Sequence, residues 1–81
     1  MKRLAGELAV AEDQLAHFVE EAEEARLRAL VSETPQADVD HHQAERHASA
    51  MRRHRDQLAA EAAALENTQN DLLDRLVAAG T

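Results

Sequence analysis

The sequence is most informative in what it lacks. The 81-residue chain has no cysteine, tryptophan or tyrosine, one phenylalanine, one proline and two glycines. The absence of cysteine excludes disulfides and thiolate-bound zinc. Almost no aromatic side chains are present to fill a globular core. A small chain of this kind needs another source of stability, such as a metal ion or self-association, and we expect self-association.

Several functional classes are disfavoured by composition. The net charge is −7, whereas nucleic-acid binding draws its affinity from Lys and Arg at phosphates. No apolar run approaches the length of a membrane span. Glu7, Glu12 and Asp13 interrupt the N-terminal apolar stretch, which a signal peptide would not tolerate. We therefore expect a cytoplasmic protein that binds neither nucleic acid nor membrane. The excess of Arg over Lys and the abundance of Ala are typical of a GC-rich bacterial genome.

The second half of the chain carries an unbroken heptad pattern, which predicts a long helix that buries one narrow stripe. One set of stripe positions is apolar throughout: Ala44, Met51, Leu58, Leu65, Leu72 and Ala79. The alternate set contains two polar members: Ala48, Arg55, Ala62, Gln69 and Leu76. Polar residues in such a stripe can specify partner and register. We expect that role for Gln69, and we expect the Arg55 head group to extend to the surface.

The first part of the chain carries a second stripe in a different phase. Its two sets are Leu8, Leu15, Ala22 and Ala29, and Leu4, Ala11, Phe18 and Ala25. Pro35 cannot continue a helix, and Thr34 followed by Pro35 is typical of a helix start. The pattern predicts one domain over residues 1–81, with a helix at about 2–31, a turn at about 32–35 and a helix at about 35–79. Gly80 is expected in a left-handed conformation after the second helix.

A short connection between two helices makes them antiparallel, so the prediction is an all-α helical hairpin. A tight turn near Glu33 would place Phe18 by Ala48, whereas a wider tip would place it by Arg55. We favour the tight turn because it sets the largest side chain against a small one. The basic block at residues 41–55 should then lie beside the acidic residues 20–24 and support that pairing.

The second helix is expected to outlast the first by about ten residues, Asn70 to Ala79. This end carries an apolar patch of Leu72, Leu73, Leu76 and Val77, and we expect Leu27 and Leu30 to extend the interface near the turn. Exposed patches of this kind mark interaction sites. We therefore predict a homodimer, as a four-helix bundle, and a non-enzymatic protein–protein interaction module: a scaffold, adaptor or regulatory subunit. Local folding of the tail over the open end is the other interpretation.

An alternative function rests on the acidic turn, which holds Glu33, Asp38 and Asp40. In outline this resembles bacterial transcript-cleavage factors, in which an acidic hairpin tip enters RNA polymerase and helps to hold a catalytic metal. The resemblance covers the hairpin only, since those factors have a second domain. It implies a regulator of a nucleic-acid enzyme.

The five histidines are His17, His41, His42, His47 and His54. Some have i, i+4 acidic neighbours, as in His41 and Glu45, but no Glu-x-x-His or His-Glu-x-x-His motif occurs. Solvated residues that pair with nearby acids, with some response to pH, are the favoured interpretation. No phosphate-binding loop or nucleophile motif is found. We expect no catalytic residue, no metal site and no cofactor.

Overall fold

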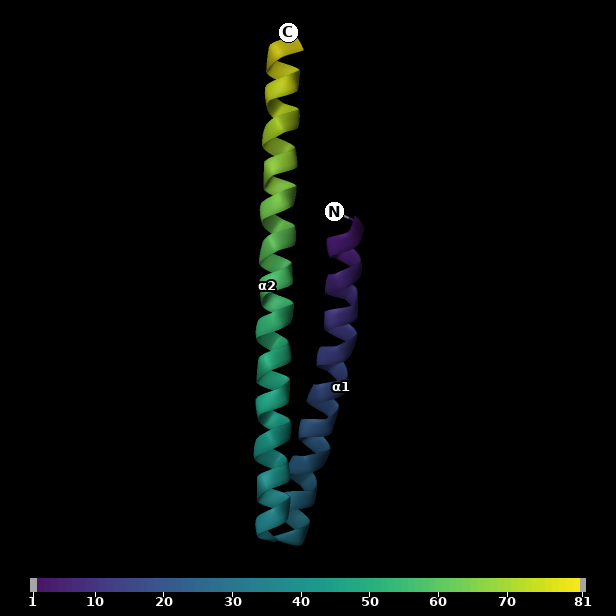
Figure 1. The fold of residues 1–81 in the computed structure, drawn as a ribbon, viewed down its shortest axis with the longest axis vertical. Coiled ribbons are helices and arrows are strands. Elements are labelled where there is room, and N and C mark those ends of the chain that lie inside the picture. The colour runs from purple at the N-terminus through teal and green to yellow at the C-terminus, as the bar shows by residue number, and fades with distance from the viewer. Residues whose placement is uncertain (1, 81) are drawn as a thin grey trace.

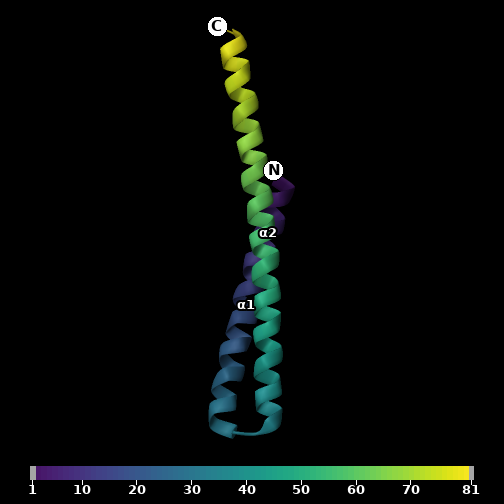
Figure 2. The same ribbon diagram turned by 90° about the vertical axis from the view of Figure 1, so that its left-hand side faces the viewer.

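Two long helices account for almost all of the protein. The computed structural model describes residues 2–80, and within that range α1 spans Lys2–Ser32 and α2 spans Pro35–Gly80, with no strand. The two helices run antiparallel and reverse direction at a single corner (Figures 1 and 2). The molecule measures 71 × 15 × 13 Å. The all-α hairpin predicted from the sequence is confirmed.

The corner is built from two residues with complementary roles. Glu33 has a φ of 49°, and its N–H donates to the carbonyl of Ala29 over 3.2 Å, which closes α1 with a left-handed residue. Thr34 then begins α2, since its Oγ1 accepts from the N–H of Ala37 over 3.1 Å. Pro35 occupies the first helical position, where its missing N–H costs nothing. The Thr-Pro start predicted from the sequence is therefore correct.

The second glycine does not have the conformation expected from the sequence. Gly80 lies within α2, and no glycine of the described chain has a positive φ. The left-handed residue of this fold is Glu33 instead. The reason is geometric, because α1 must stop and reverse within two residues, whereas α2 is still helical at Gly80.

The core is a single narrow stripe between the helices. Its buried members are Ala11, Leu15, Ala22 and Ala25 from α1 and Ala48 and Leu58 from α2. All six occupy heptad positions predicted to be buried. Four of them are alanines, so the apolar area removed from water is small and each leucine contributes a large share.

An aromatic contact fixes the register of the two helices. The ring of Phe18 packs edge to face against His47, with ring centroids 5.9 Å apart. This places Phe18 next to the small buried residue Ala48, as the tight turn requires. The wider tip would have placed Phe18 against Arg55, so the contact decides between the two registers.

Candidate interaction surface

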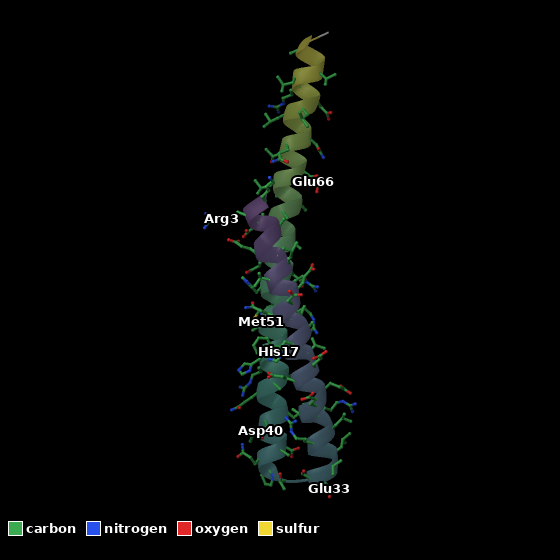
Figure 3. All side chains as sticks on the ribbon, turned by 90° about the vertical axis from the view of Figure 1, so that its right-hand side faces the viewer. Arg3, His17, Glu33, Asp40, Met51 and Glu66 are labelled. Carbon is green, nitrogen blue, oxygen red and sulfur yellow. The ribbon has the colours of Figure 1, made fainter. Side chains whose placement is uncertain are left out.

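The end of α2 extends well past the start of α1. Ala62 is the last residue of α2 that is half-buried, and every residue from 63 to 80 is exposed. We call residues 63–80 the overhang. Figure 3 shows Glu66 above Arg3, at the level where α1 begins. The overhang is longer than the ten or so residues expected, because α2, with 46 residues, has 15 more than the 31 of α1 and because the first residues of α1, Lys2 and Arg3, are themselves exposed.

The overhang carries an apolar stripe, its members exposed by between 44% and 68%: Leu65, Leu72, Leu73, Leu76 and Val77. Leu65, Leu72 and Leu76 continue the heptad positions of Ala48 and Leu58, which are buried lower in α2. The stripe therefore continues the surface that α1 covers in the paired part of the hairpin. Leu73 and Val77 widen it on one side.

The structure separates the two parts of the predicted partner-binding set. Leu27 and Leu30 are exposed, but they belong to the last turns of α1, next to the corner. The end of α2 lies at the opposite end of the 71 Å molecule (Figure 1). Within one copy they therefore cannot extend the stripe that holds Leu72, Leu73, Leu76 and Val77.

The two polar heptad residues differ in their surroundings. Arg55 is half-buried, and its Nε donates to Oδ1 of Asp56 over 2.7 Å. Its head group therefore reaches the surface, as predicted. Gln69 lies in the overhang and is exposed, beyond the part of α2 that α1 covers. Its predicted role in partner choice stays a prediction.

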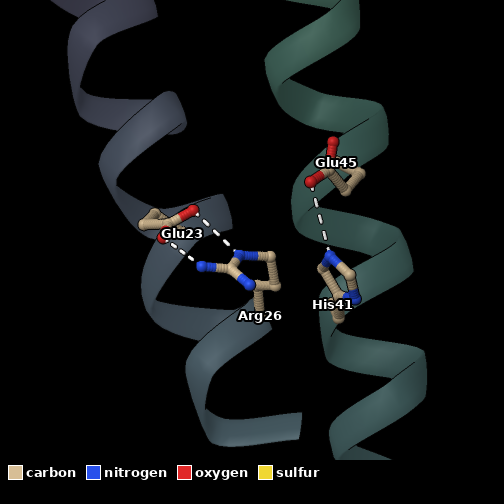
Figure 4. A network of polar contacts seen from close by, with 4 residues as sticks. All are labelled: Glu23, Arg26, His41 and Glu45. Carbon is tan, nitrogen blue, oxygen red and sulfur yellow. Dashed lines mark hydrogen bonds and ion pairs between the residues drawn. The ribbon is translucent and has the colours of Figure 1, made fainter. Parts of the chain in front are cut away.

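The charged groups pair within helices rather than between them. Each ion pair of the described residues joins neighbours on one helix, such as Arg26 with Glu23 and His41 with Glu45 (Figure 4). The hydrogen bonds from Arg26 hold the pKa of the Glu23 carboxyl below its usual value, and the pKa of Arg26 is raised in return. His41 on α2 adds only a smaller attraction to Glu23. Register is thus set by packing, and the expected cross-helix pairing contributes little.

The histidines lie singly or in pairs along the hairpin. His17 pairs with Glu21 over 3.1 Å, His41 stacks on His42 with ring centroids 5.8 Å apart, and His47 contacts Phe18. Between residues 2 and 80, no group of three His, Cys, Asp or Glu side chains is placed to hold a metal ion.

The acidic residues of the corner are all exposed. Figure 3 shows Glu33 at the end of the molecule, with Asp40 further along, in the second turn of α2. Asp40 already accepts a hydrogen bond from Nε2 of Gln36 over 2.9 Å. Asp38 lies in the first turn of α2, where an acidic side chain is favoured by the helix dipole. These contacts give Asp38 and Asp40 structural roles at the start of the helix.

An open groove lies beside the upper part of the hairpin. It has a volume of about 510 Å³, and its lining includes Gly6, Val10, Ala11, His54 and Leu58. Its floor is apolar because Ala11 and Leu58 belong to the core. The groove is open because small residues line it: Gly6 has no side chain, and Ala11 has only a methyl group.

Comparison of the chain with protein-family models, with curated proteins and with solved structures finds no match. Neither helix, over the described residues, combines the length and apolar character needed to cross a bilayer.

Proposed function

We propose that this protein is a non-enzymatic protein–protein interaction module that self-associates through the overhang. One observation carries the proposal. Eighteen consecutive residues of α2, 63–80, are exposed, and they bear an apolar stripe in phase with the stripe that α1 covers. The proposal involves no catalytic step, metal or cofactor.

The energetics of the isolated hairpin support association. Burying a leucine side chain fully is worth about 1.5–3 kcal/mol, and the overhang leaves four leucines at least 44% exposed. By comparison, only two leucines are buried in the core of the hairpin. A partner that covers the overhang would therefore bury apolar side chains that the isolated hairpin leaves exposed to water.

A second copy is the partner that the sequence itself supplies, because each copy offers a helix with the required stripe. The smallest such assembly is a dimer of four helices. These helices pack either side by side, as the four-helix bundle predicted from the sequence, or end to end through the overhangs. In either form the protein would serve as a scaffold, adaptor or regulatory subunit.

Sedimentation of three chains over a range of concentrations tests the proposal. The intact chain should form dimers, whereas a chain truncated after Gln69 and a Leu72→Ser, Leu76→Ser variant should remain monomeric. Val10→Ser is the matched control, because Val10 is 56% exposed and Leu72 is 53% exposed, but Val10 lies outside the overhang. Circular dichroism should show that all variants remain helical.

The outcomes separate clearly. An intact chain that stays monomeric at every concentration would refute self-association. A truncated chain that assembles like the intact one would show that another surface is used.

A further inference from the structure

We infer that the overhangs of two copies pair antiparallel, with Leu72 of each copy opposite Leu76 of the other. This inference rests on the proposed function and specifies the geometry of the dimer. The hairpins would then lie at the two ends of one rod, and each overhang would extend the line of the other copy's α1.

A partner helix that covers the apolar stripe of the overhang would lie in line with α1. The stripe continues the heptad positions that are buried at Ala48 and Leu58, so a partner helix would meet it as α1 meets the lower part of α2. That face is open from residue 63 onward, because α1 covers α2 only as far as Ala62. The dimer contact is in this sense a continuation of the established contact between α1 and α2.

Steric exclusion selects the antiparallel direction. Packed helices have axes about 8–10 Å apart, and each helix with its side chains is about 10–12 Å wide. In a parallel dimer, both copies of α1 would lie between the two α2 helices at the same level, where there is no room for them. In an antiparallel dimer the two α1 helices lie at opposite ends, so each copy's α1 is clear of the other.

The position of α1 also selects the register. A shift of one heptad toward the corner would place the partner's residues 79 and 80 opposite residues 62 and 61, which lie in the part of α2 that α1 already covers. A shift of one heptad the other way would leave Leu72 with no partner. The intermediate register brings Leu72 and Leu76 of the two copies together in two central layers. It also brings the two Leu73 side chains near each other across the twofold axis.

The polar residues fit this register at its margins. Gln69 lies opposite Ala79 in the outermost layer, where water reaches its amide and no buried hydrogen-bonding group is left unsatisfied. The two Arg75 side chains lie on one edge near the twofold axis, each within one helical turn of Asp71 of its own chain. Their mutual repulsion would weaken the dimer, and salt would relieve it.

The interface is small. It contains about four layers of side chains, and interfaces below about 1,200 Å² belong to the weak, reversible class. We therefore expect the dimer to dissociate on dilution, and the test must detect a weak complex.

Disulfide cross-linking suits this test because the protein contains no cysteine. Leu72→Cys and Leu76→Cys chains, one carrying a size tag, are mixed in a glutathione redox buffer at high protein concentration. Facing heptad positions meet within the range that a disulfide spans. Two copies of the same position are offset by about 6 Å along the axis, at 1.5 Å per residue. The mixed disulfide should therefore exceed either homodisulfide several-fold. Mixtures of Leu65→Cys with Leu76→Cys, and of Leu30→Cys with Leu73→Cys, serve as controls for the other arrangements.

Each outcome bears on the inference. Predominance of the Leu72→Cys and Leu76→Cys mixed disulfide supports it. Predominance of homodisulfides indicates a parallel pair, and cross-linking of Leu30→Cys to Leu73→Cys indicates a side-by-side bundle. Either result overturns the antiparallel overhang contact but leaves self-association intact. Predominance of the Leu65→Cys and Leu76→Cys mixed disulfide indicates an antiparallel pair shifted by one heptad toward the corner, which overturns the inferred register. A monomeric intact chain in sedimentation overturns both the inference and the proposed function.

Discussion

Replacement of Glu33 by glycine should stabilise the protein. Glu33 has a φ of 49°, a left-handed conformation that costs an L-residue with a side chain about 1–2 kcal/mol. Glycine adopts this conformation without that penalty, but its extra freedom in the unfolded chain costs about 0.4–1 kcal/mol. The difference is a net gain of about 0.5–1 kcal/mol. The backbone hydrogen bond from residue 33 to Ala29 does not depend on the side chain and should remain.

The assay is thermal unfolding followed by far-ultraviolet circular dichroism. A gain of this size should raise Tm by about 2–8 °C in a chain of this length. All variants must be compared at one protein concentration, because dimerisation makes Tm depend on concentration. Glu33→Ala is the control, since it removes the same charge but keeps a Cβ and therefore keeps the strain.

The two variants together give a clear decision. If Glu33→Gly and Glu33→Ala unfold at the same temperature, backbone strain at the corner is not the relevant quantity. If both are more stable than the natural chain by the same amount, the effect comes from loss of the acidic side chain rather than from the left-handed conformation.

Three further substitutions address the cap, the core and the pH response. Thr34→Ala should lower the free energy of unfolding by about 1 kcal/mol, because it removes the hydrogen bond from the Ala37 N–H, whereas Thr34→Ser should retain that bond. Equal urea midpoints for these two variants would contradict the capping role of Thr34. Leu58→Ala should lower the free energy of unfolding, measured in urea, by about 2–3 kcal/mol. This is near the low end for buried leucines, because a groove adjoins the site. A loss under about 1 kcal/mol would place Leu58 outside the core. The folded-state pKa of Glu23 is lowered, so its contribution is present above its usual value of 4.5 and is lost as the pH falls through the folded pKa. Glu23→Gln should therefore be less stable than the natural chain at pH 7 and converge with it in acid, and a gap that is constant with pH would refute this.

The heptad pattern was sufficient to predict the paired part of the hairpin. Leu15, Ala48 and Leu58 are buried where the spacing placed them, and Thr34 and Pro35 start α2 as expected. These features follow from periodicity and from the local chemistry of a helix start, both of which can be recognised in the sequence. The boundaries of the helices lie within one residue of the expected ones, which is as close as such boundaries are defined.

Other features depend on tertiary geometry and were not foreseen. The left-handed residue is Glu33 rather than Gly80, because the need to reverse direction outweighs the intrinsic preference of the side chain. The overhang begins at residue 63 rather than near residue 70, because the first residues of α1, Lys2 and Arg3, are exposed and α2 is covered only as far as Ala62. Arg26 pairs with Glu23 of its own helix, since residues three apart on a helix are already neighbours before any tertiary contact forms.

The uninterrupted run of α2 from the paired region into the overhang has a consequence for length variation. Each residue of an α-helix turns the chain by about 100°. Inserting a single residue just after Ala62 would swing the leucines of the overhang away from the direction in which α1 lies, while leaving the hairpin below unaltered. Inserting seven residues would return the leucines almost to their original direction around the helix axis and would lengthen the overhang by about 10 Å. The number of residues between the paired region and the leucines therefore sets the direction in which the overhang's stripe faces. Changes in length here should be tolerated mainly in whole heptads.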